Sequence, residues 1–155
     1  MRNDELARVQ LLDRWGVARQ PAQELYRQRV SRYRHTGAEV SVQYGLLVHY
    51  TTVDVLAAIV ELGRIGGNAG CWLTPIAYAA CIVPYDLGLA SPRDICLLVD
   101  VTTLTELWGP GTSPRSSTYP SIWRGGGVEF FSPDPIPLEC LHRIVRVEPC
   151  GDTHL

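Results

Sequence analysis

The stretch at residues 46–63, LLVHYTTVDVLAAIVELG, decides the predicted fold. Its first part, Leu46–Thr51, is rich in apolar, aromatic and β-branched residues, which predicts a strand. Thr52 has a side chain that can cap a helix, so we predict a helix over Val53–Leu62 that Gly63 ends. The core is therefore expected to combine strands with short helices.

Short apolar runs separated by glycine and proline continue this pattern after Gly37. Cys71–Thr74 predicts a short strand, and the nearly continuous apolar run Ile95–Val101 predicts a buried central strand. Two further strands are expected at Val128–Phe131 and Leu141–Val147. The order of these elements predicts an α+β fold with a split pair of small antiparallel sheets that enclose a cleft.

Three connections complete the predicted core. We expect a helical piece after Pro75, one helical turn over Thr105–Trp108, and a long loop over Gly109–Gly127 that is rich in Gly, Pro and Ser. Loops of such length are often functional, so this loop is a candidate for substrate recognition, with a plain flexible connection as the alternative. Its candidate recognition residues are Arg115, Tyr119, Trp123 and Arg124.

The N-terminal region differs in charge and periodicity from the rest of the chain. Helical spacing of apolar residues predicts one helix over Asn3–Trp15 and a second from Pro21 to about Arg34. Residues 1–36 hold eight arginines against four acidic residues, which fits either a solvated arginine face or a face that binds phosphate or a partner. We therefore predict a helical extension at residues 1–36 packed on a core at residues 37–155.

Composition excludes several classes of function. All fourteen basic residues are arginines, so a phosphate-binding P-loop lysine, a Schiff-base lysine and a Ser-Lys dyad are absent. The net charge of −2 gives no general attraction to nucleic acid or to a membrane surface. The five cysteines form no C-x-x-C pair, so we expect free, mostly buried thiols and no metal site.

No stretch of the sequence approaches the roughly 20 apolar residues that a membrane span needs, and the first residues lack the apolar core of a signal peptide. We therefore expect a cytoplasmic protein, or one delivered into a target cell as part of a larger secreted polypeptide.

Three sequence blocks follow one another along the chain: LLVHYTT before a predicted helix that ends in ELG, GCWLTP before a second predicted helix, and GGGVEFFSP. Together they resemble ADP-ribosyltransferases of the diphtheria-toxin and poly(ADP-ribose) polymerase branch, most of all bacterial toxin-type members whose first strand reads H-Y-T. The resemblance covers Leu46 to Val147 and leaves out the two N-terminal helices. It implies a split β-sheet core and NAD⁺ as a substrate.

The resemblance also implies roles for residues of the first block. His49 matches the family histidine that hydrogen-bonds the ribose in the adenosine half of NAD⁺. Tyr50 would supply backbone contacts to the nicotinamide amide, and Thr51 occupies the hydroxyl position two residues after the histidine.

Aromatic residues follow in the second block. Trp72 matches one wall of the aromatic pair that holds the nicotinamide ring, a flat cation that aromatic faces attract. The second wall is Tyr78 or Tyr85, with a slight preference for Tyr85.

Glu129 in the third block matches the family's catalytic glutamate. A carboxylate near the ribose would stabilise the positive charge that develops as the bond to nicotinamide breaks. The position two residues earlier is Gly127, whereas arginine-directed transferases carry Glu or Gln there. Arginine as the acceptor is therefore disfavoured.

The sequence thus predicts an NAD⁺-dependent ADP-ribosyltransferase, a bacterial toxin or effector that modifies a protein or nucleic acid and travels with a neutralising partner protein. Alternatives left open are an NAD⁺ glycohydrolase, an RNA 2′-phosphotransferase and an inactive NAD⁺-binding or protein-binding module. A serine or cysteine hydrolase is disfavoured because the chain has no G-x-S-x-G elbow.

Overall fold

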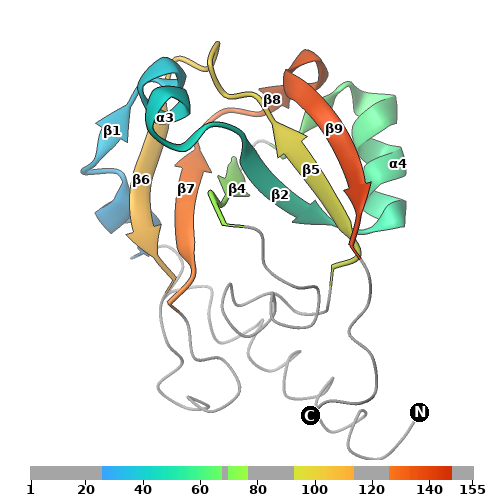
Figure 1. The fold of residues 1–155 in the computed structure, drawn as a ribbon, viewed down its shortest axis with the longest axis horizontal. Coiled ribbons are helices and arrows are strands. Elements are labelled where there is room, and N and C mark those ends of the chain that lie inside the picture. The colour runs from blue at the N-terminus through green and yellow to red at the C-terminus, as the bar shows by residue number, and fades with distance from the viewer. Residues whose placement is uncertain (1–25, 68–69, 77–92, 114–125, 148–155) are drawn as a thin grey trace, which may run out of the picture.

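The computed structural model of the chain describes residues 26–67, 70–76, 93–113 and 126–147 (Figure 1). These residues form an α+β fold, as expected, in which all strand pairings are antiparallel. The largest sheet has the order β1 (Arg34–His35), β6 (Leu107–Thr112), β7 (Val128–Ser132), β4 (Cys71–Leu73). The second sheet has the order β2 (Leu47–Thr51), β5 (Ile95–Val99), β9 (Leu141–Arg146). A small third sheet pairs β3 (Arg64–Ile65) with β8 (Ile136–Pro137), and a 3₁₀ turn, Leu138–Cys140, leads into β9.

One isolated bridge among the described residues joins the two larger sheets. The Val48 amide donates to the Thr74 carbonyl at 2.8 Å, and the Thr74 amide donates to the Val48 carbonyl at 2.9 Å. The ladder does not extend to the neighbouring residues of β2 and β4. The sheets therefore meet at one point and separate on either side of it.

The main hydrophobic core is shared by the two larger sheets. Phe130 and Leu73 enter it from the four-stranded sheet, and Leu97 enters it from the three-stranded sheet, all at most 1% exposed. Helices α3 (Gly37–Tyr44) and α4 (Val53–Leu62) add Val40 and Ile59 to the same core. The core thus fixes the position of both sheets around the bridge (Figure 1).

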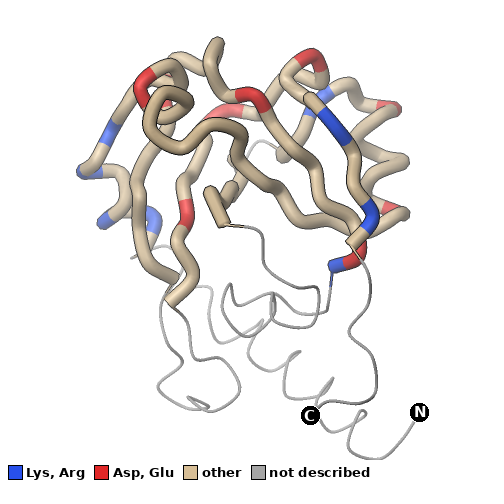
Figure 2. The backbone as a smooth tube through the Cα atoms, in the orientation of Figure 1, with Lys and Arg blue, Asp and Glu red and all other residues tan. Residues whose placement is uncertain are grey.

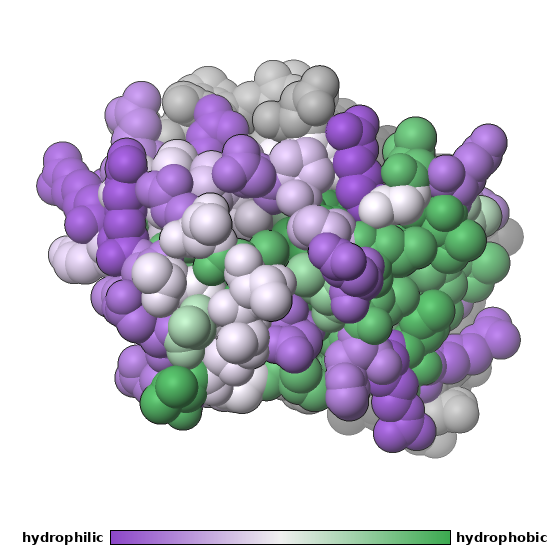
Figure 3. All heavy atoms as spheres, turned by 90° about the horizontal axis from the view of Figure 1, so that it is seen from above, coloured by the Kyte–Doolittle hydropathy of each residue, from purple (hydrophilic) through white to green (hydrophobic). Residues whose placement is uncertain are grey.

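Helix α4 forms as its sequence predicts. The Thr52 side chain accepts a hydrogen bond from the Val55 amide at 3.4 Å, which satisfies a free donor of the first turn. Gly63 ends the helix in the left-handed region with φ of 72°. Only Ile59 is buried, so α4 exposes large apolar residues, and Figure 3 shows apolar surface gathered on the side where α4 lies.

Two predictions around β6 are wrong. Thr105–Trp108 forms no helical turn, because Leu107 is fully buried in β6 and Trp108 pairs with Phe131 of β7. The predicted loop over Gly109–Gly127 is wrong at its start, because residues 109–112 belong to β6 and continue its ladder with β7. Cross-strand packing there overrides the weak strand propensity of glycine.

The predicted helix from Pro21 to Arg34 is also too long at its C-terminal end. Residues 26–30 are helical, but Arg34–His35 form β1 on β6. Helix α3 was not predicted, although the sequence carries a capping signal: the Thr36 side chain accepts from the Glu39 amide at 3.2 Å. The predicted helix at residues 3–15 and the helical piece after Pro75 lie outside the described residues.

Charge is distributed unevenly over the described chain. Four arginines occur between residues 26 and 34, and Figure 2 shows basic positions beside the outer edge of the four-stranded sheet. Within the described ranges, no helix has the length and apolar character needed to cross a bilayer.

Candidate functional site

A pocket of about 200 Å³ opens where β2 and β4 separate. Residues 48–50 form one side of it, residues 70–74 form the other, and Glu129 reaches it from β7. The fold therefore brings His49, Tyr50, Trp72 and Glu129 to one cavity although they come from three strands. Tyr78 and Tyr85, the candidates for a second aromatic wall, lie outside the described residues.

His49 spans the gap between the two strands. Its Nδ1 lies 2.8 Å from the Trp72 carbonyl oxygen, which can only accept, so Nδ1 carries the hydrogen and donates it. Burial lowers the pKa of His49, the hydrogen bond to Trp72 partly offsets this, and the nearby charge of Arg93 lowers the pKa further. The neutral ring is thus favoured, and its Nε2 is left as a hydrogen-bond acceptor.

Cys71 lies against the same histidine without a nucleophile's environment. Its Sγ is 3.3 Å from His49 Nδ1, and burial raises the pKa of its thiol to about 12. A thiol that stays protonated near neutral pH is a poor nucleophile. This contact therefore supplies packing around His49 rather than a Cys-His dyad.

Tyr50 and Thr51 are both buried in β2 but differ in their relation to the pocket. Tyr50 lines it and packs with Val48 and Cys96 on the face of the three-stranded sheet away from the main core. Thr51 is 2% exposed, pairs with Ile95 and does not line the pocket.

Glu129 is a carboxylate in a buried strand position. It is 6% exposed and lies between Val128 and Phe130 in β7, opposite Gly111 of β6. Burying a carboxylate is costly unless partners or a function of its charge offset the cost, so a buried carboxylate in a pocket wall is a candidate functional group. Its presence in the pocket wall makes Glu129 the strongest candidate there for chemistry.

The ring of Trp72 belongs to an aromatic cluster on the outer face of the four-stranded sheet. Tyr26 stacks on it with centroids 5.0 Å apart and an angle of 2° between the planes. Phe131 contacts it at 4.7 Å and 52°, and Trp108 contacts Phe131 at 5.3 Å. One face of Trp72 is thus covered by Tyr26, a contact that the sequence did not predict because Tyr26 was interpreted only as part of a helical apolar pattern.

The candidate recognition loop begins close to Glu129. The Ser113 amide donates to the Gly127 carbonyl at 2.8 Å, and the Gly127 amide donates to the Ser113 Oγ at 2.9 Å. These bonds join Ser113 to Gly127, the described residues on either side of residues 114–125, and Gly127 lies two residues from Glu129. The proposed recognition residues Arg115, Tyr119, Trp123 and Arg124 themselves lie outside the described residues.

Comparison with known proteins gave no match to any protein-family model, to any curated protein or to any solved structure.

Proposed function

We propose that this chain is an NAD⁺-dependent ADP-ribosyltransferase with an ADP-ribosyltransferase-like split β-sheet core. The observation that carries the proposal is the convergence of His49, Trp72 and Glu129 on one pocket at the junction of two sheets. These residues come from separate sequence blocks, and their convergence is what the family resemblance requires.

The proposed reaction uses Glu129 to stabilise developing charge. The bond between the nicotinamide nitrogen and ribose C1′ breaks, and its electron pair cancels the positive charge on the nicotinamide ring. The ribose becomes oxocarbenium-like, and the buried carboxylate favours this cation more strongly than a solvated group would. A nucleophile of the acceptor then bonds to C1′, and its proton passes to Glu129 or to solvent.

His49 supplies ground-state binding in this proposal. A neutral ring with Nε2 as acceptor suits a ribose hydroxyl, which can donate a hydrogen bond. The 2′-phosphate of NADP⁺ offers acceptors instead, so NADP⁺ would be the poorer substrate. The pocket volume of about 200 Å³ suits one ring of a dinucleotide rather than the whole molecule.

The acceptor in this proposal is a macromolecule, protein or nucleic acid. Gly127 offers no side chain two residues before Glu129, which supports an acceptor other than arginine. Modification of an essential target would make the protein a bacterial toxin whose producer needs a neutralising partner protein. Inducible expression in a bacterium should then arrest growth, and Glu129→Gln should relieve the arrest at equal soluble yield.

Labelled NAD⁺ tests the enzymatic proposal directly. The purified protein is incubated with NAD⁺ labelled in the ADP-ribose part and with cell extracts, and both nicotinamide release and label transfer are measured. Transfer that Glu129→Gln abolishes supports a transferase. Release without transfer in any extract identifies an NAD⁺ glycohydrolase instead, and neither release nor transfer contradicts both activities and favours a binding module.

A further inference from the structure

Tyr26 lies at the interface between the N-terminal segment and the candidate site. It is 5% exposed, and its ring is parallel to that of Trp72. It shares a hydrophobic cluster with Val30 and Phe131. The helical turn at residues 26–30 thus packs on the same sheet face that carries Phe131, two positions along β7 from Glu129.

The sheet leaves room for the Tyr26 hydroxyl at Gly111, the residue that pairs with Glu129. Gly111 pairs with Glu129, and a Cβ added at Gly111 would lie 2.9 Å from the Tyr26 hydroxyl oxygen and 2.6 Å from Val30 Cγ2. A residue with any side chain would displace the phenol or the helical turn. The lack of a side chain at this position therefore allows the hydroxyl to approach the strand that carries the carboxylate.

The Tyr26 hydroxyl is a buried polar group that lacks the hydrogen bond such groups usually make: it has no hydrogen-bond partner among the described residues. Burial raises the pKa of Tyr26 most, the Glu129 carboxylate raises it further, and the charge of Arg29 lowers it. The phenol therefore stays protonated near neutral pH and can donate a hydrogen bond beside Gly111, the residue that pairs with Glu129.

We propose that Tyr26 is a positioning residue whose hydroxyl orients the Glu129 carboxylate toward the pocket. The inference rests on the proposed function, because it gives Tyr26 a role through the catalytic carboxylate. Phenylalanine would form the same stack on Trp72 without the cost of burying a hydroxyl, so packing alone does not account for tyrosine. Catalytic hydrogen bonds are often long or poorly aligned before substrate binds and tighten in the complex, so a hydroxyl without a formed hydrogen bond is consistent with this role.

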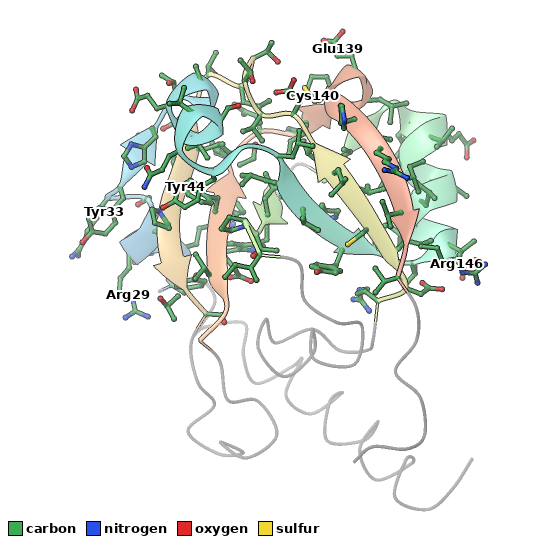
Figure 4. All side chains as sticks on the ribbon, in the orientation of Figure 1. Arg29, Tyr33, Tyr44, Glu139, Cys140 and Arg146 are labelled. Carbon is green, nitrogen blue, oxygen red and sulfur yellow. The ribbon has the colours of Figure 1, made fainter. Side chains whose placement is uncertain are left out.

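Tyr26→Phe tests the role while keeping the stack. We expect kcat for nicotinamide release to fall by about 10- to 100-fold, the range for losing one hydrogen bond to a charged group, with KM for NAD⁺ nearly unchanged. Tyr33→Phe is the matched control: it removes a hydroxyl from the same segment, but Tyr33 is 61% exposed and points away from the sheet (Figure 4). This control should keep the wild-type kcat.

A double-mutant cycle separates positioning from general packing. If Tyr26 acts through Glu129, Tyr26→Phe should cause little further loss in a Glu129→Gln background, measured by single-turnover release of labelled nicotinamide. Gly111→Ala, which crowds the hydroxyl without removing a polar group, should lower kcat in the wild-type background and have little effect in the Glu129→Gln background. Thermal melts confirm that each variant is folded.

The outcomes distinguish this inference from the proposed function. An active wild type with an unchanged kcat in folded Tyr26→Phe overturns the role of Tyr26 and leaves the proposed function intact. The role of Tyr26 is also overturned if Tyr26→Phe lowers the rate of nicotinamide release by the same factor in the wild-type and the Glu129→Gln backgrounds. A wild type that releases no nicotinamide overturns the proposed function, and the role of Tyr26 with it.

Discussion

Replacing Glu129 by glutamine removes one negative charge from the pocket and keeps the side-chain shape. Glu129 is 6% exposed, so its charge acts through protein rather than through bulk water. At an effective dielectric constant of about 20, two unit charges roughly 4 Å apart interact by about 4 kcal/mol. Positive charge develops on the ribose only as the bond to nicotinamide breaks, so most of this energy appears in turnover. We expect kcat to fall by about 10²–10³.

The assay for Glu129→Gln separates binding from turnover. Calorimetric titration should give nearly the same Kd for NAD⁺ as the wild type, while nicotinamide release should fall by the factor above. Glu139→Gln is the matched control, because Glu139 is exposed and lies in the turn before β9 (Figure 4). A folded Glu129→Gln protein with near-normal turnover, or one whose only defect is weaker NAD⁺ binding, would refute this reasoning.

Three further predictions concern binding, acid stability and packing. His49→Ala should weaken NAD⁺ binding, measured by calorimetry, as well as turnover, because the ring contacts a part of the ligand remote from the reacting bond; an unchanged Kd would contradict its role. Because the folded pKa of His49 lies below its ordinary value of 6.5, the unfolded chain binds the proton first, so urea stability should fall as the pH drops below about 6.5. His49→Asn should lose part of this pH dependence, and an identical pH profile would count against a neutral His49 ring in the folded protein. Gly70→Ala would place a Cβ 2.3 Å from Phe131 Cζ at a φ of +90°, so the free energy of unfolding should drop by about 1–3 kcal/mol. Gly67→Ala is the control, because its Cβ would meet open space and stability should change little. Equal urea midpoints for the two variants would contradict the packing described.

The sequence predicted elements whose signals are local. The strand and capped helix at residues 46–63 agree with β2 and α4 to within one residue, because a β-branched run, a threonine cap and a terminal glycine each act over a few positions. The buried run at β5 and the strands β7 and β9 were recognised for the same reason. Strand β6 was missed because its glycines suit the ladder only once Tyr26, Val30 and Phe130 pack beside them.

The placement of the candidate site residues was predictable in part. Sequence order indicated His49, Trp72 and Glu129 as a set, and the structure brings them to one pocket. The stack of Tyr26 on Trp72 and the neighbourhood of its hydroxyl depend on long-range packing, which helical spacing does not encode. Likewise, the predicted boundary between a helical extension and a core at residue 36 did not indicate that Arg34–His35 pair with β6, because strand partners are distant in the chain.

The bridge between Val48 and Thr74 consists of main-chain hydrogen bonds, and both residues are at most 6% exposed. Amide and carbonyl groups are the same in every residue except proline, so the junction places few demands on side-chain identity. Relatives of this chain are therefore expected to retain the bridge even where most of the surrounding residues have been substituted during evolution. Divergent homologues would then be easier to recognise by an isolated two-residue bridge between two sheets than by the amino-acid sequence of any one motif.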